Sequence, residues 1–364
     1  MSALKRTFLF LVFLGIIAGG AGLWLAFWPN TATYDEPRGV RLPEGLSFDA
    51  AVDSLESAGI IGSAATFRMF GRITGWSEQV KTGHYLIPSG ASNWAILDKI
   101  RKGLQDPIRI TVPPGLTAGR FAHVLERQLG TDSAAVRAAL RDPALAESLD
   151  TDTAHLFGHM RASTYDIFWT TDAPRALSRI HGWYDRFWTD ERLEKARALG
   201  LTPDQVVTMA SIVEWEVRKP EERARVAGVY LNRLLGRTAA GRMRLQADPT
   251  VQFAMMQADG GPMRRLMLRD YRFPSPYNTY LIEGLPPGPI NNPSDATIDA
   301  VLDNEEHDFL FFVADPDNVG GHVFTRNGAE HAAAARRWSQ WLTEQVRIRR
   351  ERERAAGAAP TPTP

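Results

Sequence analysis

The chain contains no cysteine among its 364 residues. Disulfide bonds and thiolate catalysis are therefore excluded, but a cysteine-free protein is stable on either side of a membrane. An excess of charge is missing as well, because 42 basic residues balance 42 acidic ones. Such a balance gives no overall electrostatic attraction to nucleic acid, so we expect no nucleic-acid partner.

Several short catalytic signatures are also absent. The eight histidines form no HExxH motif and no close ligand pair, although His307, His322 and His331 are near one another in sequence. There is no GxSxG elbow for a serine nucleophile and no glycine-rich phosphate loop. Because metal, serine-hydrolase and nucleotide sites depend on such patterns, we expect no metal and no cofactor.

One long hydrophobic run is present, from Thr7 to Trp28, and Lys5 and Arg6 precede it. As a helix it spans roughly 33 Å, enough for the hydrocarbon core of a membrane. The run ends in aromatic residues and Pro29, where a cleaved signal peptide would have a small-residue cleavage site. The positive-inside rule predicts a single-pass membrane protein whose short N-terminal tail stays in the cytoplasm and whose chain from Pro29 onward is extracytoplasmic. A signal peptide is the alternative.

Three later segments share one pattern: an apolar residue, Pro, any residue, Gly, another residue, and Ser or Thr. A Pro-x-Gly turn followed by a capping hydroxyl predicts a strand, a tight turn and a capped helix. Strands are expected at 84–87 and 109–112. The pattern is LysM-like and typical of small glycan-binding modules, with a plain α+β packing domain as the alternative. The three copies are LPEGLS (42–47), IPSGAS (87–92) and VPPGLT (112–117).

The C-terminal half predicts helices at 203–218 and from Pro220, and a helix capped by Ser294 or Asp295. A buried strand is expected at 308–314, with 322–325 as its neighbour. A closing helix should run from 329 to about 350, before a tail rich in Ala, Pro and Thr.

The run TMASIVEWEVR places Glu214 and Glu216 beside the apolar face of the first of these helices. Two positions correspond to about 200° on a helix, so the two carboxyl groups point apart. A mechanism built on this helix must use one of them, because both cannot face the same substrate atom. Alternatively, both are rim glutamates paired with Arg218, Arg223 or Arg225.

Polar and aromatic residues gather in the irregular segments that follow. They occur in MRLQADPT (243–250), PYNTY (276–280) and GLPPGPI (284–290). Amides and hydroxyls pair with sugar hydroxyls, and aromatic rings cover the apolar faces of a pyranose. Around an isolated acid, these segments favour a sugar-binding cleft.

The order of these motifs resembles the MltG (YceG-like) family of endolytic murein transglycosylases. The matching segments are MASIVEWE, VYLNRL, MRLQADPTV, PYNTY, GLPPGPI, FLFFVAD and GGHVFT, behind a membrane helix and a LysM-like region. The resemblance covers nearly all of Lys5 to Trp341. It implies that Glu216 is the catalytic acid and base, with Glu214 as the alternative. The implied substrate-binding residues are Gln246, Asp248, Thr250, Asn278, Thr279, Tyr280, Asn232 and Arg233.

One segment departs from the family pattern. Members usually carry a run like EGYLFPDTY before the catalytic domain, and here residues 157–165 read FGHMRASTY. The expected Glu, Pro and Asp are missing, so substrate contacts or activity are expected to differ if those residues shape the cleft.

The resemblance implies cleavage of the bond between N-acetylmuramic acid and N-acetylglucosamine in nascent peptidoglycan. The reaction is non-hydrolytic, leaves 1,6-anhydro ends and terminates strand elongation. Glycan strands, the membrane and peptidoglycan synthases are the implied partners. Two alternatives stay open: a hydrolytic muramidase using Glu216 and Asp248, and a non-catalytic peptidoglycan-binding scaffold.

The expected fold class is α+β. The expected segments are a cytoplasmic tail (1–6), a transmembrane helix (7–28), a small LysM-like α/β subdomain (29–130), a helical connecting region (131–172), a mixed α+β catalytic domain (173–346) and a charged, then disordered tail (347–364).

Overall fold

The computed structural model describes residues 3–261 and 264–357. It is a mixed α+β structure in which the chain forms two compact units. Unit 1 holds the described residues of Met1–Ile110, His123–Ser133 and Thr164–Ala176, and unit 2 holds those of Thr111–Ala122, Ala134–Ser163 and Leu177–Pro364. The units are interleaved along the chain, so they do not correspond one to one with the consecutive segments expected from the sequence.

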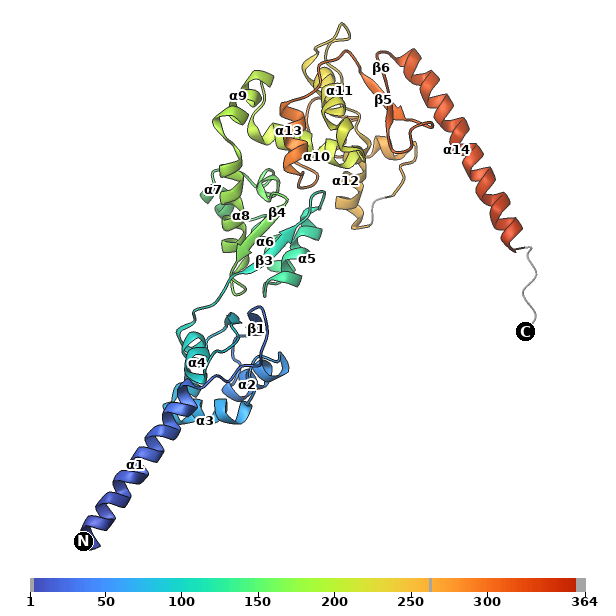
Figure 1. Ribbon diagram of the computed structural model, residues 1–364. Coiled ribbons are helices and arrows are strands. Elements are labelled where there is room, and N and C mark those ends of the chain that lie inside the picture. The colour runs from blue at the N-terminus through green and yellow to red at the C-terminus, as the bar shows by residue number, and fades with distance from the viewer. Residues whose placement is uncertain (1–2, 262–263, 358–364) are drawn as a thin grey trace. The chain divides into compact units, whose positions relative to one another are not determined.

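Unit 1 is built on one antiparallel pair of strands with helices packed on it (Figure 1). Val40 lies opposite Tyr85 in this pair, and both side chains are buried in the core of the unit. Its elements are α1 (Ala3–Phe27), β1 (Arg38–Leu42), α2 (Phe48–Ser57), α3 (Ala64–Thr74), the 3₁₀ helix η1 (Trp76–Gln79), β2 (Gly83–Ile87) and α4 (Asn93–Lys102).

Five elements have residues in both units or at their border: β3 (Ile108–Val112), α5 (Ala118–Gln128), α6 (Ser133–Ala139), β4 (Ser163–Ile167) and α8 (Ala173–Phe187). Strand β3 pairs with β4. The strand β4 was not expected, because STYDI lies in a region whose pattern predicts mostly helix.

The three repeated turns are confirmed as strand–turn–helix units. Gly45, Gly90 and Gly115 have φ angles of 73°, 82° and 73°, in the left-handed region that glycine adopts without steric cost. Ser47 and Ser92 then cap α2 and α4 by accepting hydrogen bonds from backbone N–H groups three residues later. The Pro-x-Gly-x-Ser/Thr pattern therefore determines the local fold at each site.

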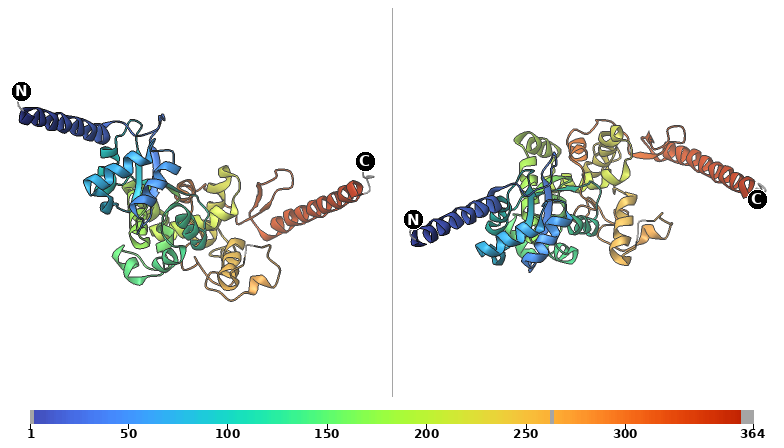
Figure 2. Two further views of the ribbon diagram at one scale, coloured as in Figure 1. Left: turned by 90° about the horizontal axis from the view of Figure 1, so that it is seen from below. Right: turned by 60° about the horizontal axis from the view of Figure 1, so that its bottom comes forward.

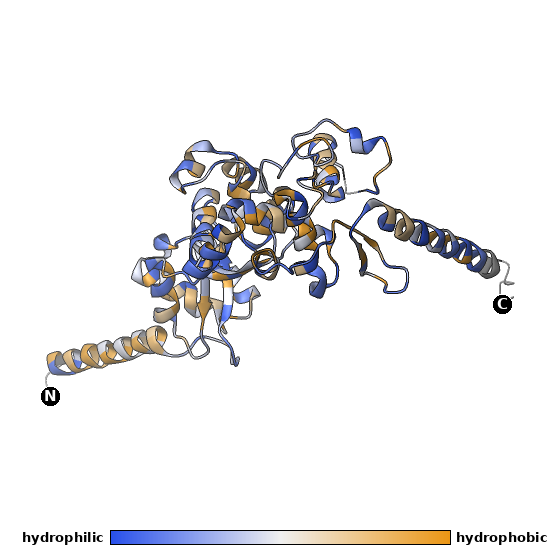
Figure 3. Ribbon diagram, turned by 90° about the horizontal axis from the view of Figure 1, so that it is seen from above, coloured by the Kyte–Doolittle hydropathy of each residue, from blue (hydrophilic) through white to orange (hydrophobic). Residues whose placement is uncertain are grey.

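Helix α1 is the one helix in the described residues that is long and apolar enough to cross a membrane, over Leu4–Phe27, although a signal sequence near the N-terminus would pass the same test. Figure 3 shows its hydrophobic character along most of its length. The end of α1 is joined to unit 1 by side chains. The amide Nδ2 of Asn93 donates to the carbonyl of Leu25 at 2.8 Å, and Nδ2 of Asn30 donates to Oδ1 of Asn93 at 2.6 Å.

Unit 2 surrounds the buried helix α10 with α11, α12 and α13 (Figure 1). Thr202 and Gln205 form a reciprocal capping box at the start of α10, and Pro203 occupies its first turn. The elements of unit 2 are α7 (Pro143–Ser148), η2 (Leu156–His159), α9 (Asp190–Leu199), α10 (Pro203–Glu216), η3 (Pro220–Glu222), α11 (Arg223–Leu235), α12 (Asp248–Asp259), η4 (Asp270–Arg272), α13 (Asp295–Leu302), β5 (Phe311–Ala314), β6 (His322–Thr325) and α14 (Gly328–Gly357).

The C-terminal elements differ from expectation in two ways. Strand β5 is shorter than 308–314, and its residues are only partly buried. Strand β6 is the other strand of its sheet. The expectation of a buried strand was wrong, because each residue of β5 keeps part of its surface exposed. Helix α14 continues to Gly357, well into the expected tail, and Figure 2 shows it as one rod extending beyond β5 and β6. The expected disorder at 358–364 lies outside the described residues.

Candidate active site

Helix α10 carries the two acids, and its end determines where they lie. Its residues from Val206 to Val213 are buried, whereas Glu214 and Glu216 are partly exposed. The helix ends at Glu216, and Val217 is extended. The acids therefore stand where the buried helix leaves the core of unit 2.

Glu214 is used to join two helices. Its Oε2 accepts hydrogen bonds from the backbone N and the Oγ of Ser294 at 3.1 and 2.8 Å, and another from the hydroxyl of Thr297. Arg223 pairs with its other oxygen at 3.7 Å. Because Ser294 caps α13, the carboxylate lies at the positive end of that helix and fastens it to α10.

Glu216 has different surroundings. Burial, and then the negative charge of Asp248, raise the pKa of Glu216 to about 8, against the opposing effects of a hydrogen bond with Tyr230 and the charge of Arg233. A carboxyl group with this pKa is mostly protonated at neutral pH and can donate its proton. The expectation that the two glutamates point apart is confirmed, because they contact different sets of residues.

Asp248 is the first residue of α12, where the helix dipole favours a negative charge. Its two carboxylate oxygens accept hydrogen bonds from the hydroxyls of Tyr280 at 2.7 Å and Tyr271 at 3.3 Å. The two phenol rings lie 4.5 Å apart, and burial followed by the charge of Asp248 raises the pKa of both hydroxyls. Both phenols therefore stay neutral and keep their protons for the carboxylate.

Tyr230 and Arg233 form the buried floor of this acid pair. Both come from α11, and their side chains are 1% and 6% exposed. Arg233 donates from Nε to the carbonyl of Leu310 at 2.6 Å and from Nη1 to that of Leu245. Its neighbour Asn232 donates to the carbonyls of two residues, at 2.8 and 3.0 Å, in the segment before β5. Asn232 and Arg233 thus fix α11 to the chain around the site.

Thr250, Asn278 and Thr279 are fully buried and use their polar atoms internally. The hydroxyls of Thr250 and Thr279 are 2.9 Å apart, and Thr279 also accepts from the backbone of Ala247 at 2.9 Å. Asn278 donates to the carbonyls of two residues next to or within η4. These bonds hold the start of α12 against the PYNTY segment, and so bring Asp248 to Tyr280.

Gln246 is placed differently from its neighbours. It is exposed, and its φ angle of 49° puts it in the left-handed region, where a residue other than glycine is uncommon. Its backbone N–H donates to the carbonyl of Thr279 at 3.2 Å. Such a constrained backbone is frequent at functional sites, and it leaves the amide side chain accessible to a ligand.

The structure adds two features that the sequence did not predict. Tyr230 lies in the same VYLNRL segment as Asn232 and Arg233, and its hydroxyl forms a hydrogen bond with Glu216. An aromatic residue in a helix pattern predicts a core residue, so the sequence did not indicate this contact. The third repeated turn also lies beside the acid, because Trp215 donates from Nε1 to the carbonyl of Gly115 at 2.9 Å. Asn292 holds that turn by accepting from the backbone N of Leu116 at 2.7 Å.

Across residues 3–261 and 264–357, no group of three or more His, Asp or Glu side chains is arranged to hold a metal ion. The site therefore combines the carboxyl group of Glu216, whose pKa is raised to about 8, with the carboxylate of Asp248 and the phenol hydroxyls that donate to it.

Comparison with known proteins places these features in a family. A model of the YceG-like family matches residues 40–337. The chain is 26% identical over 357 residues to a protein of Streptococcus pneumoniae serotype 2 (strain D39 / NCTC 7466) that is named endolytic murein transglycosylase; the match covers 88% of this chain and 62% of that protein. A protein of Bacillus subtilis (strain 168) with the same name is 27% identical over 319 residues; the match covers 82% of this chain and 84% of the relative.

A solved structure is also similar. The crystal structure of a yceG-like protein from Listeria monocytogenes matches with a TM-score of 0.56 and 26% identity, over 82% of this chain and 98% of that one. Together with the family match over residues 40–337, this likeness in fold agrees with the motif order in the sequence. The chain belongs to the YceG-like family.

Proposed function

We propose that this protein is an endolytic murein transglycosylase that cleaves the bond between N-acetylmuramic acid and N-acetylglucosamine. The observation that carries the proposal is the carboxyl group of Glu216, whose pKa is raised to about 8 by burial and by the charge of Asp248. A proton donor of this kind is what cleavage of a glycosidic bond requires near neutral pH. The names of the relatives from Streptococcus pneumoniae and Bacillus subtilis support the same reaction.

The reaction proceeds through one carboxyl group that acts twice. Glu216 donates its proton to the glycosidic oxygen as the bond from that oxygen to the anomeric carbon breaks, which releases the N-acetylglucosamine hydroxyl. The ionised Glu216 then takes the proton of the muramyl 6-hydroxyl while that oxygen bonds to the anomeric carbon. The products are a 1,6-anhydro end and a free hydroxyl, no water is consumed, and Glu216 is protonated again.

Asp248 supplies the negative charge that an oxocarbenium-like transition state needs. Tyr280 and Tyr271 hold this carboxylate by their hydrogen bonds. Of the residues expected to bind substrate, Gln246 is the exposed one that is free to contact a sugar directly. The others with buried polar groups act by positioning the site: Thr250, Asn278, Thr279, Asn232 and Arg233.

Two alternative functions make different use of the same residues. A hydrolytic muramidase would use Asp248 as nucleophile or base beside Glu216, and would leave reducing ends. A glycan-binding scaffold would rely on the LysM-like region expected at 29–130, without cleavage. The raised pKa of the Glu216 carboxyl group favours an enzyme, because a scaffold gains nothing from a carboxyl group that costs energy to desolvate.

Purified sacculi incubated with the full-length protein in detergent separate the three functions by mass spectrometry of the products. We expect 1,6-anhydro-muramyl ends. Reducing ends would favour the hydrolase, and intact sacculi the scaffold. Glu216→Gln should lower product formation by about 10²–10⁴-fold, since it removes the acid and base. Glu221→Gln, an exposed glutamate just beyond α10, is the matched control and should retain activity.

The site operates at the membrane in this proposal. Helix α1 is a single-pass anchor in the inner (plasma) membrane, and the rest of the chain lies on the periplasmic or extracytoplasmic side. The hydrogen bonds of Asn93 and Asn30 at the end of α1 support an anchor that is retained, because cleavage there would remove part of the packing of unit 1. There the enzyme meets nascent strands, terminates their elongation and contacts peptidoglycan synthases.

Intact mass measurement of the protein extracted from membranes tests the anchor. We expect a mass that includes α1 and extraction by detergent but not by alkaline carbonate. A mass that begins after residue 28 would identify a cleaved signal peptide instead.

A further inference from the structure

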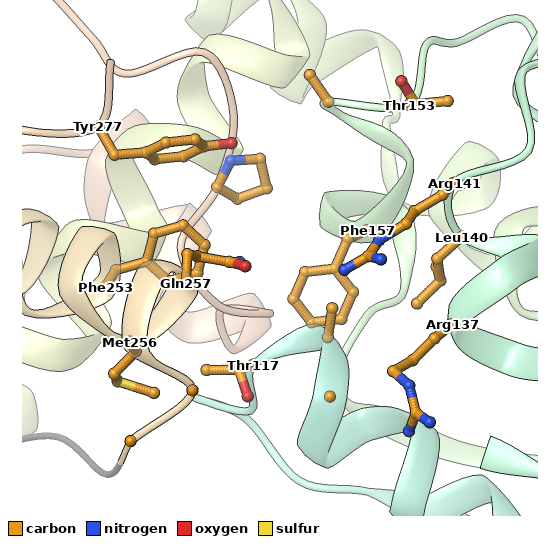
Figure 4. A pocket seen from close by; sticks show the side chains of 16 residues that line it. Thr117, Arg137, Leu140, Arg141, Thr153, Phe157, Phe253, Met256, Gln257 and Tyr277 are labelled. Atoms are coloured by element: carbon orange, nitrogen blue, oxygen red, sulfur yellow. The ribbon is translucent and has the colours of Figure 1, made fainter. Parts of the chain in front are cut away.

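A cavity of about 400 Å³ lies within unit 2, beside α12 and away from the polar end of that helix. Figure 4 shows Phe253, Gln257 and Tyr277 on one side of it, opposite Arg137 and Arg141. Its volume falls in the range of about 300–1,000 Å³ that is usual for sites of small ligands. The cavity is therefore large enough to hold a short peptide or a sugar substituent.

The two arginines give the cavity its charge. Arg137 is partly buried at the end of α6, and Arg141 is exposed just after that helix. Within residues 3–261 and 264–357, neither guanidinium has a carboxylate partner. A guanidinium presents a planar fork of donors that matches a carboxylate, so two such groups at one cavity favour an anionic ligand.

An aromatic wall connects the cavity with the candidate active site. The rings of Phe253 and Tyr277 are 4.9 Å apart, and that of Phe253 lies 6.4 Å from the ring of Trp215, the residue before Glu216. Phe253 follows Asp248 on α12 by about 8 Å of helix rise. A sugar chain that places a bond at Glu216 would therefore bring its next substituent to the cavity.

Gly119 is one of the residues that line the cavity, and the space beside it is free. A Cβ atom added at Gly119 would meet no atom within 4 Å, and the φ angle of this residue is not positive. A larger side chain at this position would extend into free space without straining the backbone. Gly119 thus offers a way to fill the cavity without changing its charge.

The geometry points to a subsite in which Arg137 and Arg141 bind the carboxylates of the peptide that substitutes the muramyl sugar, while Phe253 and Tyr277 pack against its apolar parts. This inference rests on the proposed function and deepens it. The enzyme then prefers strands that still carry peptides over bare glycan. Glu216 acts on the sugar backbone, and the cavity binds the peptide that the sugar carries.

The test compares two substrates with the full-length protein in detergent: glycan strands that carry peptides, and the same strands after an amidase has removed them. In the Arg137→Gln/Arg141→Gln variant, kcat/KM should fall on the peptide-bearing strands by about 10–100-fold more than on the bare strands, through KM. Gly119→Met should produce the same selective loss by filling the cavity. Arg336→Gln, an exposed arginine of α14, is the matched control and should change neither rate.

Binding of a free muramyl peptide, measured by calorimetry, gives a second readout that does not depend on cleavage. We expect wild type to bind it, and both cavity variants to bind it at least tenfold more weakly. Equal losses on both substrates, or unchanged peptide binding in folded variants, would overturn the subsite. A wild-type protein that binds the peptide but cleaves neither substrate would instead refute the proposed function and leave the subsite supported.

Discussion

Glu214 and Glu216 lie two positions apart on α10 and contact different partners. The carboxylate of Glu214 accepts hydrogen bonds from Ser294 and Thr297 at the start of α13, whereas that of Glu216 is desolvated beside Asp248. The first residue therefore joins two helices, and the second is available for proton transfer. The two acids of one helix therefore differ in role: Glu214 fastens α13, and Glu216 is the residue that we propose as acid and base.

Glu214→Gln should destabilise the fold. The amide loses the charge that interacts with the α13 N-terminus and with Arg223, and it has one acceptor oxygen where the carboxylate has two. We expect the free energy of unfolding to fall by about 1–3 kcal/mol in urea titrations. Glu221→Gln serves as the control. A Glu214→Gln protein as stable as wild type would show that these bonds do not hold α13.

Glu216→Gln should change how stability depends on pH. With a pKa of about 8 in the folded state and 4.5 as the ordinary value, Glu216 binds a proton in the folded chain but not in the unfolded chain between these limits. Wild-type stability is therefore penalised as pH rises through that window, and the penalty is absent below about pH 4.5. The variant lacks this penalty.

Each pKa unit corresponds to about 1.4 kcal/mol, so the advantage of the variant should grow to the order of a few kcal/mol by pH 8. Urea titrations of both proteins at pH 5, 6.5 and 8 measure this difference. Parallel stability curves for the two proteins would contradict a raised pKa at Glu216.

The pH dependence of activity should respond in opposite directions to two substitutions. Asp248→Asn removes a charge that raises the pKa of Glu216, so the alkaline loss of activity should move to lower pH. Tyr230→Phe removes a hydrogen bond that lowers this pKa, so the alkaline loss should move to higher pH. Profiles of kcat/KM on glycan strands report both shifts.

Asp259→Asn removes a charge from the exposed end of the same helix and is the matched control for Asp248→Asn. Its profile should coincide with that of wild type. Shifts of Asp248→Asn and Tyr230→Phe in the same direction would disprove the assignment of Glu216 as the titrating acid.

Gly228→Ala should destabilise unit 2 at the close approach of α11 to the segment before β5. A Cβ at Gly228 would lie 2.5 Å from the carbonyl oxygen of Glu305, which cannot move without displacing the backbone. We expect a loss of about 1–3 kcal/mol in the free energy of unfolding.

Gly182→Ala on α8 is the opposite case, since its Cβ would have one neighbour within 4 Å, the flexible end of Arg186 at 3.8 Å. There the higher helix propensity of alanine should stabilise the protein by about 0.5–1 kcal/mol. Denaturation of both variants in urea tests the pair, and equal changes would show that local space does not decide the outcome.

The sequence predicts local structure well here because the local signals are strong. The turns at Gly45, Gly90 and Gly115 follow from Pro-x-Gly and a capping hydroxyl, and the divergence of Glu214 and Glu216 follows from helical periodicity. These features depend on residues a few positions apart. They need no knowledge of the tertiary fold.

Which glutamate is available for catalysis could not be predicted in this way from residues alone. The answer depends on Ser294 and Thr297, which come from a distant part of the chain and occupy Glu214. The buried roles of Thr250 and Asn278 were equally inaccessible, because a hydroxyl or amide in a loop sequence fits a ligand contact as well as an internal bond. The partial burial of β5 was also not predictable, because it depends on the strands and helices that pack beside it, and only the fold defines those.

The hydrogen bond between the amide of Asn93 and the last turn of α1 limits the motion of unit 1 relative to that helix. Asn93 and Asn30 fix the end of the helix to the rest of unit 1, so α1 does not act as a flexible linker. With α1 in the bilayer, unit 1 would drift with the lipids at a set height above them. For the proposed transglycosylase, encounters with glycan would then depend on lateral diffusion and on the local concentration of strands in a thin layer, and strands beyond that layer would not be cleaved.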